Sequence, residues 1–501
     1  MNRLHLMGRL CAAWVVLFAL GGCATRPINA PITKADPDAG YRMATRQSHY
    51  KDPETMVVLA FSGGGTRAAA FSYGVLEFLR HTEIMQADGR KVRLLDGVEV
   101  ITGVSGGSFT ALAYGLYGDK LFSDYEQRFL KRDVQGELIG RALNPLIWPK
   151  LGLTEWGRSE LAAELYDEIL FNGATFADLG RGNGPLILAS ATDVSSGARM
   201  VFDQDLWDVI CSDLNTFPLS RAAAASSAVP GVLSTVTLNN YGGTCHWKPP
   251  PGVELFAGSA VPPRAALRAK RQIDELLALG DGAHRPYLHL VDGGVADNVG
   301  MRGVLTVIDT MEMLNAAGVP TRLDKARRIV VFVVNSKSSP RTDWDESPSG
   351  PGLISLMVQS SGIPIEHYSY ESVELLQDKE ARWQTQRRLR QSPAFTSNKD
   401  PAIAAALKGP DASIFTIDVS FAALEDKAEG ALLNELPTSF VLPAESVDRL
   451  RAAAGTIIMA SPEFQRLLRD MGATIASPSA STGAAAAPMD RVDPMLAPVG
   501  K

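Results

Sequence analysis

One apolar run that leads straight into a glycine turn limits what this chain can fold into. Residues 56–61 (MVVLAF) carry no charged or polar side chain, which is typical of a strand buried on both faces of a parallel sheet. Three glycines follow at 63–65, and apolar residues at helical spacing then run from Phe71 to Leu79. A strand that turns through glycines directly into a helix begins a βαβ unit, so the sequence predicts an α/β fold.

The same alternation continues along the chain. Further mostly apolar stretches predict strands at 98–102, 186–191, 288–291 and 328–334, with helices between them. Strands that alternate with helices form parallel sheets covered on both faces, so we expect a three-layer α/β/α sandwich with a mostly parallel central sheet. The net charge of −6 and the absence of a long basic run argue against nucleic acid as a partner.

Composition divides the 501 residues into four segments. We expect a signal peptide at 1–22, a polar tether at 23–55, a globular domain at 56–475 and a disordered tail at 476–501. The core of the globular domain is expected at 56–335, with insertions near 240–286 and 336–400.

The N-terminus resembles a bacterial lipoprotein signal. Arg3 and Arg9 accompany an apolar run at 10–20, which is shorter than the ~20 residues that a membrane-spanning helix needs. The sequence Leu-Gly-Gly-Cys ends at Cys23 and is similar to a lipobox, which implies cleavage before this cysteine and its acylation. Ala24 favours the outer membrane. We therefore expect a lipid-anchored protein of the bacterial cell envelope that faces the periplasm or the surface; the alternative is an ordinary cleaved signal.

The cysteines separate into two groups. Cys11 lies in the predicted signal and Cys23 at its end, which leaves Cys211 and Cys245 in an exported domain. A disulfide between these two is one expectation, and two buried thiols are the other. No Cys/His cluster has the spacing of a zinc site, so we expect no metal.

A serine stands on a second strand-to-helix turn. The stretch 103–107 (GVSGG) follows a predicted strand and opens a helix, so Ser105 is expected on a tight turn that exposes its Oγ. The glycines let the chain fold back without a Cβ clash, and the amide of Gly106 favours a developing oxyanion. These features predict a nucleophilic serine; the alternative is a glycine-rich structural turn.

A nucleophilic serine needs a base, and the sequence offers two kinds. The order serine, acid, histidine of α/β-hydrolases leaves only His367 beyond the candidate acid Asp292. The second kind is Asp292 itself, which ends the apolar run at 288–291. Strand ends line the crevice of open α/β sheets, and a buried carboxylate there can accept the serine proton directly. The alternative is a turn aspartate that caps the next segment.

The glycine loop at 63–65 fits two uses. Consecutive glycine amides at a helix start bind anions, and the spacing to Ala68 fits a dinucleotide fingerprint. That fingerprint wants an acidic residue after a second strand, but the residues around Asp88 do not look like a strand. The other use is an oxyanion hole, with Arg67 nearby as a structural or electrostatic aid.

Together, these motifs resemble the patatin-like phospholipase family, whose members carry Gly-Gly-Gly-x-Arg, Gly-x-Ser-x-Gly and Asp-Gly-Gly or Asp-Gly-Ala in this order. The resemblance implies a patatin-like fold and a Ser-Asp dyad, with Ser105 as nucleophile and Asp292 as base. It also implies an oxyanion hole formed by Gly63, Gly64, Gly65 and Gly106, with Arg67 as a supporting residue. The remaining motif glycines are Gly103, Gly107, Gly293 and Gly294.

The likeness extends beyond these motifs and has two departures. The stretches 191–202, 225–230, 292–298 and 436–440 also look similar to the family. Ser62 stands where the family usually has Asp or Ala, and Ala68 stands where it usually has glycine. The glycines of the loop are intact, so we expect activity to survive both changes.

The resemblance implies a serine acyl-hydrolase of the lipase or phospholipase A type. Such an enzyme cleaves carboxylic ester bonds of membrane lipids through an acyl-serine intermediate and needs no metal or organic cofactor. Two alternatives remain beside it. One is a catalytically silent envelope lipoprotein that binds lipid or a partner, and the other is a Ser-His-Asp esterase.

Overall fold

The computed structural model describes most of the chain between Arg26 and Ala476. The described residues are 26–46, 52–86, 89–153, 155–249, 266–316, 318–338, 344–346, 348, 350, 352–393, 400, 403, 407 and 409–476. The predicted signal peptide, Cys23 and the predicted tail beyond Ala476 lie outside them. No helix within the described ranges is long and apolar enough to cross a membrane.

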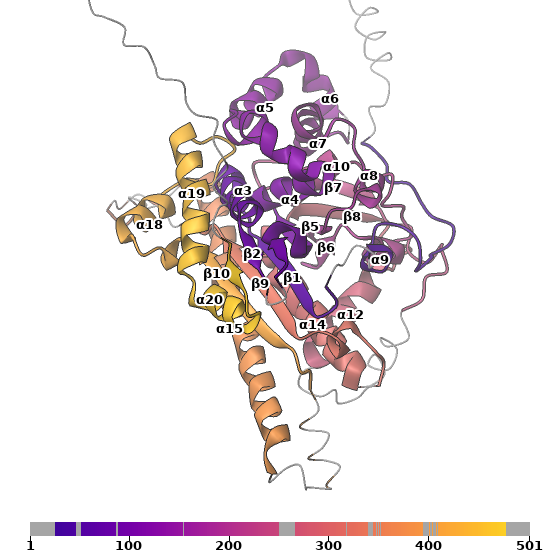
Figure 1. Cartoon of the computed structure of the whole chain (residues 1–501). Coiled ribbons are helices and arrows are strands. Elements are labelled where there is room, and N and C mark those ends of the chain that lie inside the picture. The colour runs from indigo at the N-terminus through magenta and orange to yellow at the C-terminus, as the bar shows by residue number, and fades with distance from the viewer. Residues whose placement is uncertain are drawn as a thin grey trace, which may run out of the picture.

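A central sheet of eight strands forms the middle layer (Figure 1). Its strands are β1 (Thr55–Phe61), β4 (Val98–Val104), β5 (Leu186–Asp193), β6 (Arg199–Val201), β7 (Val236–Asn239), β8 (Tyr287–Asp292), β9 (Arg328–Asn335) and β10 (Ser413–Ser420). Their order is β10-β9-β1-β4-β5-β8-β7, with β6 beside β5. The pairs from β10 to β5 are all parallel, whereas β6, β7 and β8 pair antiparallel.

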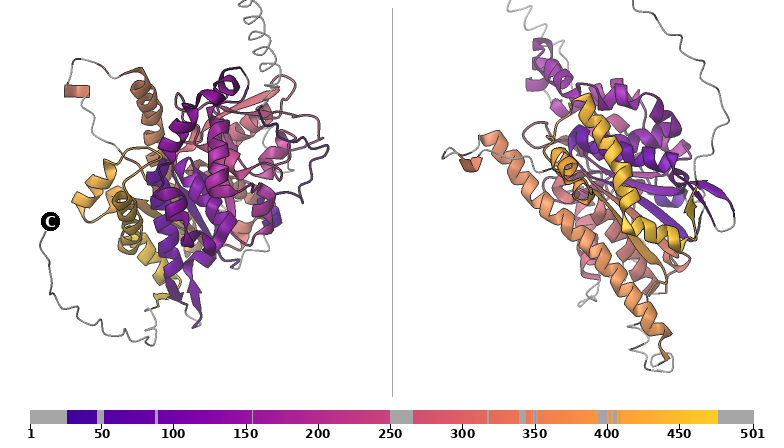
Figure 2. Two further views of the ribbon diagram at one scale, coloured as in Figure 1. Left: turned by 90° about the horizontal axis from the view of Figure 1, so that it is seen from above. Right: turned by 60° about the vertical axis from the view of Figure 1, so that its left-hand side comes forward.

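Helices cover both faces of this sheet. They are α2 (Met43–Arg46), α3 (Gly65–His81), α4 (Gly106–Tyr117), α5 (Val134–Ala142), α6 (Trp148–Leu153), α7 (Arg158–Tyr166), α8 (Phe176–Arg181), α9 (Gln204–Val209), α10 (Leu219–Ser226), α12 (Ala266–Leu279), α13 (Gly294–Asp297), α14 (Met301–Ala316), α15 (Leu353–Gln391), α18 (Lys427–Asn434), α19 (Ala444–Ala460) and α20 (Pro462–Asp470). Figure 2 shows α15 on the face opposite α3 and α19. The predicted three-layer arrangement with a mostly parallel sheet is confirmed.

The central strands are mostly apolar and buried because both of their faces are covered. All seven residues of β4 are buried, and so are the last seven residues of β9. Every strand that was predicted from a continuous apolar run is present. This agreement follows from the fact that a strand buried on two faces has no polar side to hide its pattern.

Strands with a weaker pattern were not predicted. The edge strand β10 carries polar residues within its apolar run, and its Asp418 is exposed. A small separate sheet of β2 (Glu83–Met85), β3 (Lys91–Arg93) and β11 (Thr474–Ile475) pairs antiparallel and brings the described C-terminus back to the end of α3. Three-residue strands are too short to show a period of two.

The segment from Arg26 to Arg46 packs on the domain, although the sequence predicts a tether for 23–55. Arg42 is 2 % exposed and forms ion pairs of 2.7 Å with Asp205 and Asp208. The guanidinium of Arg46 donates to backbone carbonyls, among them that of Leu179 at 2.9 Å. Such contacts to buried arginines hold this part of the chain against the surface.

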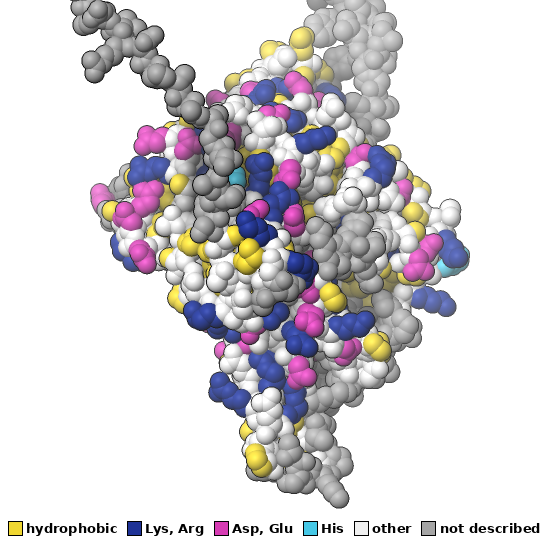
Figure 3. Space-filling view, in the orientation of Figure 1, with side chains coloured by type: hydrophobic (Ala, Val, Ile, Leu, Met, Phe, Trp, Pro, Cys, Tyr) yellow, Lys and Arg dark blue, Asp and Glu magenta, His cyan; other side chains and the backbone are white. Residues whose placement is uncertain are grey.

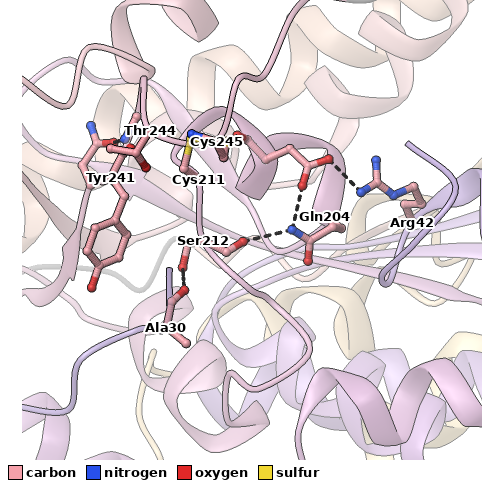
Figure 4. Close-up of a disulfide and its surroundings, with 11 residues drawn as sticks. Ala30, Arg42, Gln204, Cys211, Ser212, Tyr241, Thr244 and Cys245 are labelled. Carbon is pink, nitrogen blue, oxygen red and sulfur yellow. Dashed lines mark hydrogen bonds and ion pairs between the residues drawn. A yellow bond between two sulfur atoms is a disulfide. The ribbon is translucent and has the colours of Figure 1, made fainter. Parts of the chain in front are cut away.

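A disulfide between Cys211 and Cys245 lies beneath the same segment (Figure 4). Its two Cα atoms are 5.4 Å apart. The carbonyl of Cys211 accepts a hydrogen bond from the amide of Ile32 at 2.9 Å, and that of Cys245 accepts one from Ala35 at 3.1 Å. Ser212 Oγ donates to the carbonyl of Ala30 at 2.9 Å. The disulfide therefore fixes the surface to which the N-terminal segment is bound.

Candidate active site

Ser105 occupies a strained turn between β4 and α4. Its φ of 48° and ψ of −120° lie in a region that side-chain-bearing residues rarely adopt. The amide of Ser105 donates to Oγ of Ser226 at 2.9 Å, and that hydroxyl donates in turn to the carbonyl of Ser190 at 2.7 Å. Ser108 Oγ donates to the carbonyl of Ser105 at 2.6 Å. These bonds keep the strained turn in place and leave the Oγ of Ser105 for other partners.

The hydroxyl of Ser105 is paired with the carboxylate of Asp292. Ser105 Oγ donates to Asp292 Oδ2 at 2.8 Å. The second oxygen, Oδ1, accepts from the amide of Gly294 at 2.8 Å. Thr192 Oγ1 donates to the carbonyl of Asp292 at 2.9 Å, which fixes the backbone of the aspartate as well. Both carboxylate oxygens are thus held, with one of them directed at the serine.

The route by which Asp292 reaches the serine differs from the predicted one. The sequence places it at the carboxyl end of a strand lining the crevice of a parallel sheet, but β8 runs antiparallel to β5. The last residue of β8, Asp292, pairs with Ala191 inside β5. The last residue of β4, Val104, pairs with the adjacent Ser190 on the other side of β5, so β8 ends level with the end of β4. An apolar run such as 288–291 carries no information on strand direction.

Burial adjusts the basicity of Asp292. The residue is 8 % exposed, and this burial raises its pKa to about 6, although the hydrogen bonds from Gly294 and Ser105 act in the opposite direction. A carboxylate with a pKa near 6 is a stronger base than an exposed aspartate and is still ionised at neutral pH. The pair therefore has the charge state that proton transfer from Ser105 requires.

The glycine loop lies directly against the serine turn. Gly64 and Gly65 have φ values of 138° and 59°, which favour glycine. A Cβ on Gly106 would lie 2.0 Å from the carbonyl oxygen of Gly65, and a Cβ on Gly63 would lie 3.2 Å from Cβ of Ser105. Only glycine permits this approach, which brings two turns that are distant in sequence to one place.

The amides of the loop divide into two kinds. Gly63 donates to the carbonyl of Asn298 at 2.9 Å, so its amide is used within the protein. For Gly64, Gly65 and Gly106, no acceptor lies within the described part of the chain. Of the four glycines predicted for the oxyanion hole, the last three offer donors, whereas Gly63 contributes close approach. The expectation for the Gly63 amide is corrected on this ground.

Arg67 acts within the protein and is buried. Its guanidinium donates to the carbonyls of Ser336 at 2.8 Å and Leu436 at 2.7 Å, and to Oγ1 of Thr438 at 3.0 Å. Desolvation lowers its pKa to about 10. Since Ser439 O accepts from the amide of Thr66 at 2.8 Å, the same segment also covers the start of α3. The hydrogen bonds of Arg67 thus hold the segment 436–439 against the glycine loop.

Some supporting residues were not assigned a role from sequence. The Oγ of Ser226 accepts a hydrogen bond from the amide of Ser105, and Oγ1 of Thr192 donates one to the carbonyl of Asp292. The carbonyl of Asn298 accepts a hydrogen bond from the amide of Gly63. All three lie in stretches that resemble the family, which is the signal that could have found them. Ser336 donates through Oγ to the carbonyl of Gly63 at 3.0 Å, and nothing in its local sequence indicates this contact.

Among the residues that the structure describes, the alternative interpretations of these motifs find no support. His289 lies in β8 with Nδ1 3.0 Å from Thr237 Oγ1, and His284 is paired with Asp281. The side chain of His367 and the whole of Asp88 lie outside the described residues. A dinucleotide fold would place an acidic residue at the end of the parallel strand that follows α3, but that strand is β4, which ends at Val104 and leads into Ser105.

The fold and these contacts define a class of protein: an α/β protein with a serine on a strained strand-to-helix turn, a carboxylate in contact with it and donor amides beside both. Residues 59–305 match the family model described as Patatin-like phospholipase. This part of the chain belongs to the patatin-like phospholipase family. Gly63, Ser105 and Asp292 all fall within the matched range.

Solved structures resemble this chain at low sequence identity. Human GIVD cytosolic phospholipase A2 is 14 % identical with a TM-score of 0.41, and the match covers 86 % of this chain and 65 % of that one. VipD from Legionella pneumophila is 10 % identical with a TM-score of 0.27, covering 90 % and 72 %. The type III effector protein ExoU is 16 % identical with a TM-score of 0.21, covering 84 % and 80 %.

The match thus spans slightly less than two thirds of the human chain. No curated protein matches this sequence.

Proposed function

We propose that this chain is a serine acyl-hydrolase that cleaves carboxylic ester bonds of membrane lipids, with Ser105 as nucleophile and Asp292 as general base. The observation that carries the proposal is the 2.8 Å hydrogen bond from Ser105 Oγ to Asp292 Oδ2 on a strained turn. Membership of the patatin-like phospholipase family supports lipid esters as the substrate class.

The first half of the reaction forms an acyl-serine. Asp292 Oδ2 takes the proton of Ser105 as Oγ attacks the carbonyl carbon of the ester. The amides of Gly64, Gly65 and Gly106 donate to the oxyanion of the tetrahedral intermediate. The bond to the alcohol then breaks, and Asp292 returns the proton to the departing oxygen.

The second half of the reaction releases the acid. Water gives its proton to Asp292 and attacks the acyl-serine carbonyl, and the same amides hold the second oxyanion. Collapse of this intermediate breaks the bond to Oγ, which takes the proton back from Asp292. The products are a fatty acid and the free serine, so neither a metal nor an organic cofactor enters any step.

The location forms part of the proposal. We place the enzyme at the bacterial outer membrane, held through acylation of Cys23, because the sequence Leu-Gly-Gly-Cys resembles a lipobox. Anchored in this way, Ser105 would work beside the membrane that contains its substrate. Radiolabelled palmitate should enter the wild-type chain and fail to enter Cys23→Ser.

A lipid panel tests the reaction. Purified wild-type protein should release fatty acid from at least one class of phospholipid or acylglycerol, and Ser105→Ala should lose ~10⁴-fold or more in kcat. A fluorophosphonate should label the wild type and leave Ser105→Ala unlabelled. Full turnover by Ser105→Ala would refute the scheme. Lipid binding without turnover or labelling would favour the silent envelope lipoprotein instead.

A further inference from the structure

Four large apolar side chains are exposed close together on α5, α6 and the turn between them. Ile139 is 51 % exposed, Leu143 65 %, Leu146 87 % and Trp148 57 %. We call these four residues the α5–α6 patch. Figure 3 shows hydrophobic side chains at the top of the molecule, where Figure 1 places α5 and α6. A cluster of this kind marks a binding surface more often than a single exposed leucine does.

The patch is held in a defined shape. Ile139 and Leu143 are four residues apart and therefore lie on one side of α5. Trp148 Nε1 donates to the carbonyl of Ala142 at 3.2 Å, which ties the start of α6 to the end of α5. Asp133 caps α5 by accepting from the amide of Gly136 at 2.7 Å. The exposed side chains thus project from a capped helix and a fixed turn.

The patch lies close to the point where the chain leaves toward Cys23. Arg26 forms an ion pair of 3.3 Å with Glu155, which follows α6, and the neighbouring Trp156 has the ammonium of Lys150 3.5 Å from its ring centroid. Cys23 precedes Arg26 by three residues, which span at most about 11 Å of extended chain. A lipid on Cys23 would therefore enter a membrane beside α6.

The patch is also connected to the catalytic residues. The amide of Gln135, in the first turn of α5, donates to the carbonyl of Phe440 at 3.3 Å, and Phe440 donates back to Gln135 Oε1 at 3.2 Å. The carbonyl of Ser439, the residue before Phe440, accepts a hydrogen bond from the amide of Thr66, which follows the glycine loop. One short segment thus links the base of α5 to the oxyanion loop.

We propose that the α5–α6 patch is a membrane-docking surface, which inserts into the head-group region of a phospholipid bilayer. The proposal rests on the proposed function for its choice of occupant, a lipid surface. Tryptophan and leucine are the side chains that interfacial helices bury, and the proposed acylation of Cys23, three residues before Arg26, would bring this side of the molecule to the bilayer.

The test measures vesicle binding without the anchor. The mature chain from residue 24 onward, which lacks both the apolar signal and Cys23, is mixed with vesicles of phosphatidylethanolamine and phosphatidylglycerol, and the bound fraction is measured by sedimentation. Leu146→Asp and Leu143→Asp should each lower the partition coefficient about tenfold, because each removes a buried leucine from the interface. Leu432→Asp is the matched control, since Leu432 is 40 % exposed on α18 and should bind as the parent does.

A second measurement, of ester hydrolysis, separates membrane docking from catalysis. Hydrolysis of a water-soluble short-chain ester should be unchanged in all three variants, because none of these side chains touches Ser105 or Asp292. A parent that binds vesicles through Leu146 but neither cleaves the ester nor reacts with a fluorophosphonate would leave docking supported and overturn the proposed function. Brominated lipids should quench the tryptophan fluorescence of the parent. The quenching should be weaker in Trp148→Phe, because this variant lacks the tryptophan of the patch.

Two results would overturn the docking proposal. One is vesicle binding that is absent in the parent or equal in Leu146→Asp and Leu432→Asp. The other is a parent that sediments as a dimer and becomes a monomer in Leu146→Asp without any change in vesicle binding, which would assign the patch to a second copy of the chain.

Discussion

Ser105 Oγ lies 2.8 Å from Asp292 Oδ2, although the two residues are 187 positions apart in the sequence. Their strands are not neighbours, because β5 lies between β4 and β8. Val104 pairs with Ser190 on one side of β5, and Asp292 pairs with Ala191 on the other. The two side chains therefore meet across this middle strand.

Activity should follow the ionisation of Asp292. Burial raises the pKa of this carboxyl to about 6, and only the ionised form can accept the proton of Ser105. We expect kcat/KM for a soluble ester to rise with pH, with its midpoint near pH 6, and then to level off. Asp292→Asn should lose ~10²–10⁴-fold in kcat and show no such inflection. A rate that stays flat from pH 5 to pH 8 in the wild type would contradict the assignment of the base.

The same burial should cost stability at neutral pH. The pKa of Asp292 is raised in the folded protein, so the folded state holds the proton more tightly than the unfolded state does. Its contribution is fully present below pH ~4 and is lost as the pH rises through about 6. We therefore expect urea unfolding to show Asp292→Asn more stable than the wild type by about 2 kcal/mol at neutral pH, and much less so near pH 4. Equal differences at both values would show that the carboxyl is not desolvated.

The contact between the two glycine turns should not tolerate a methyl group. In Gly106→Ala, the new Cβ would lie 2.0 Å from the carbonyl oxygen of Gly65, so one of the turns must move. We expect a stability loss of about 1–3 kcal/mol and an ester hydrolysis rate lowered ~100-fold, because the donor amides are displaced. Gly97→Ala is the control, since a Cβ there meets nothing within 4 Å. Near-normal kinetics in Gly106→Ala would place the oxyanion donors elsewhere.

Arg67 should act by positioning its neighbours. Its guanidinium serves three neutral acceptors at once, and the single ammonium of a lysine cannot reach all of them. Arg67→Lys should therefore unfold at lower urea concentration, by ~2 kcal/mol, and lower kcat more than it raises KM. Arg141→Lys is the control, because Arg141 makes one exposed ion pair, to Glu168. A variant with unchanged stability and kcat would remove the positioning role.

The disulfide should stabilise the domain and its N-terminal segment together. Replacing both Cys211 and Cys245 by serine should lower the free energy of unfolding by about 3 kcal/mol, the usual gain from closing a loop of this length. Hydrogen exchange should become faster at the amides of Ile32 and Ala35, which bond to the carbonyls of the two cysteines. Dithiothreitol should reproduce both effects in the wild type and leave the double variant unchanged.

The part of the fold that the sequence predicts is the part with continuous apolar runs. The runs at 56–61 and 329–334 are apolar throughout because β1 and β9 are buried on both faces, and both strands are present. The edge strand β10 is not predicted, because Thr416 and Asp418 interrupt its apolar residues and no glycine turn into a helix follows it, as one does after β1 and β4. The polar composition of residues 26–46 predicts a tether, because composition does not show that Arg42 and Arg46 are buried in ion pairs and backbone contacts.

The sequence by itself determined which residues belong to the candidate site, because the chemistry of a turn is local. Gly103 and Gly106 lie on either side of Ser105, and three glycines precede Thr66. Glycines at these positions predict tight turns, and the structure contains both turns. Only the tertiary structure decided how the turns meet. It directs Asp292 to the serine along a strand that runs against its neighbour, uses the amide of Gly63 internally and leaves those of Gly64 and Gly65 with no acceptor in the described residues. Strand direction and hydrogen-bond partners depend on residues far away in the chain, and no local pattern contains them.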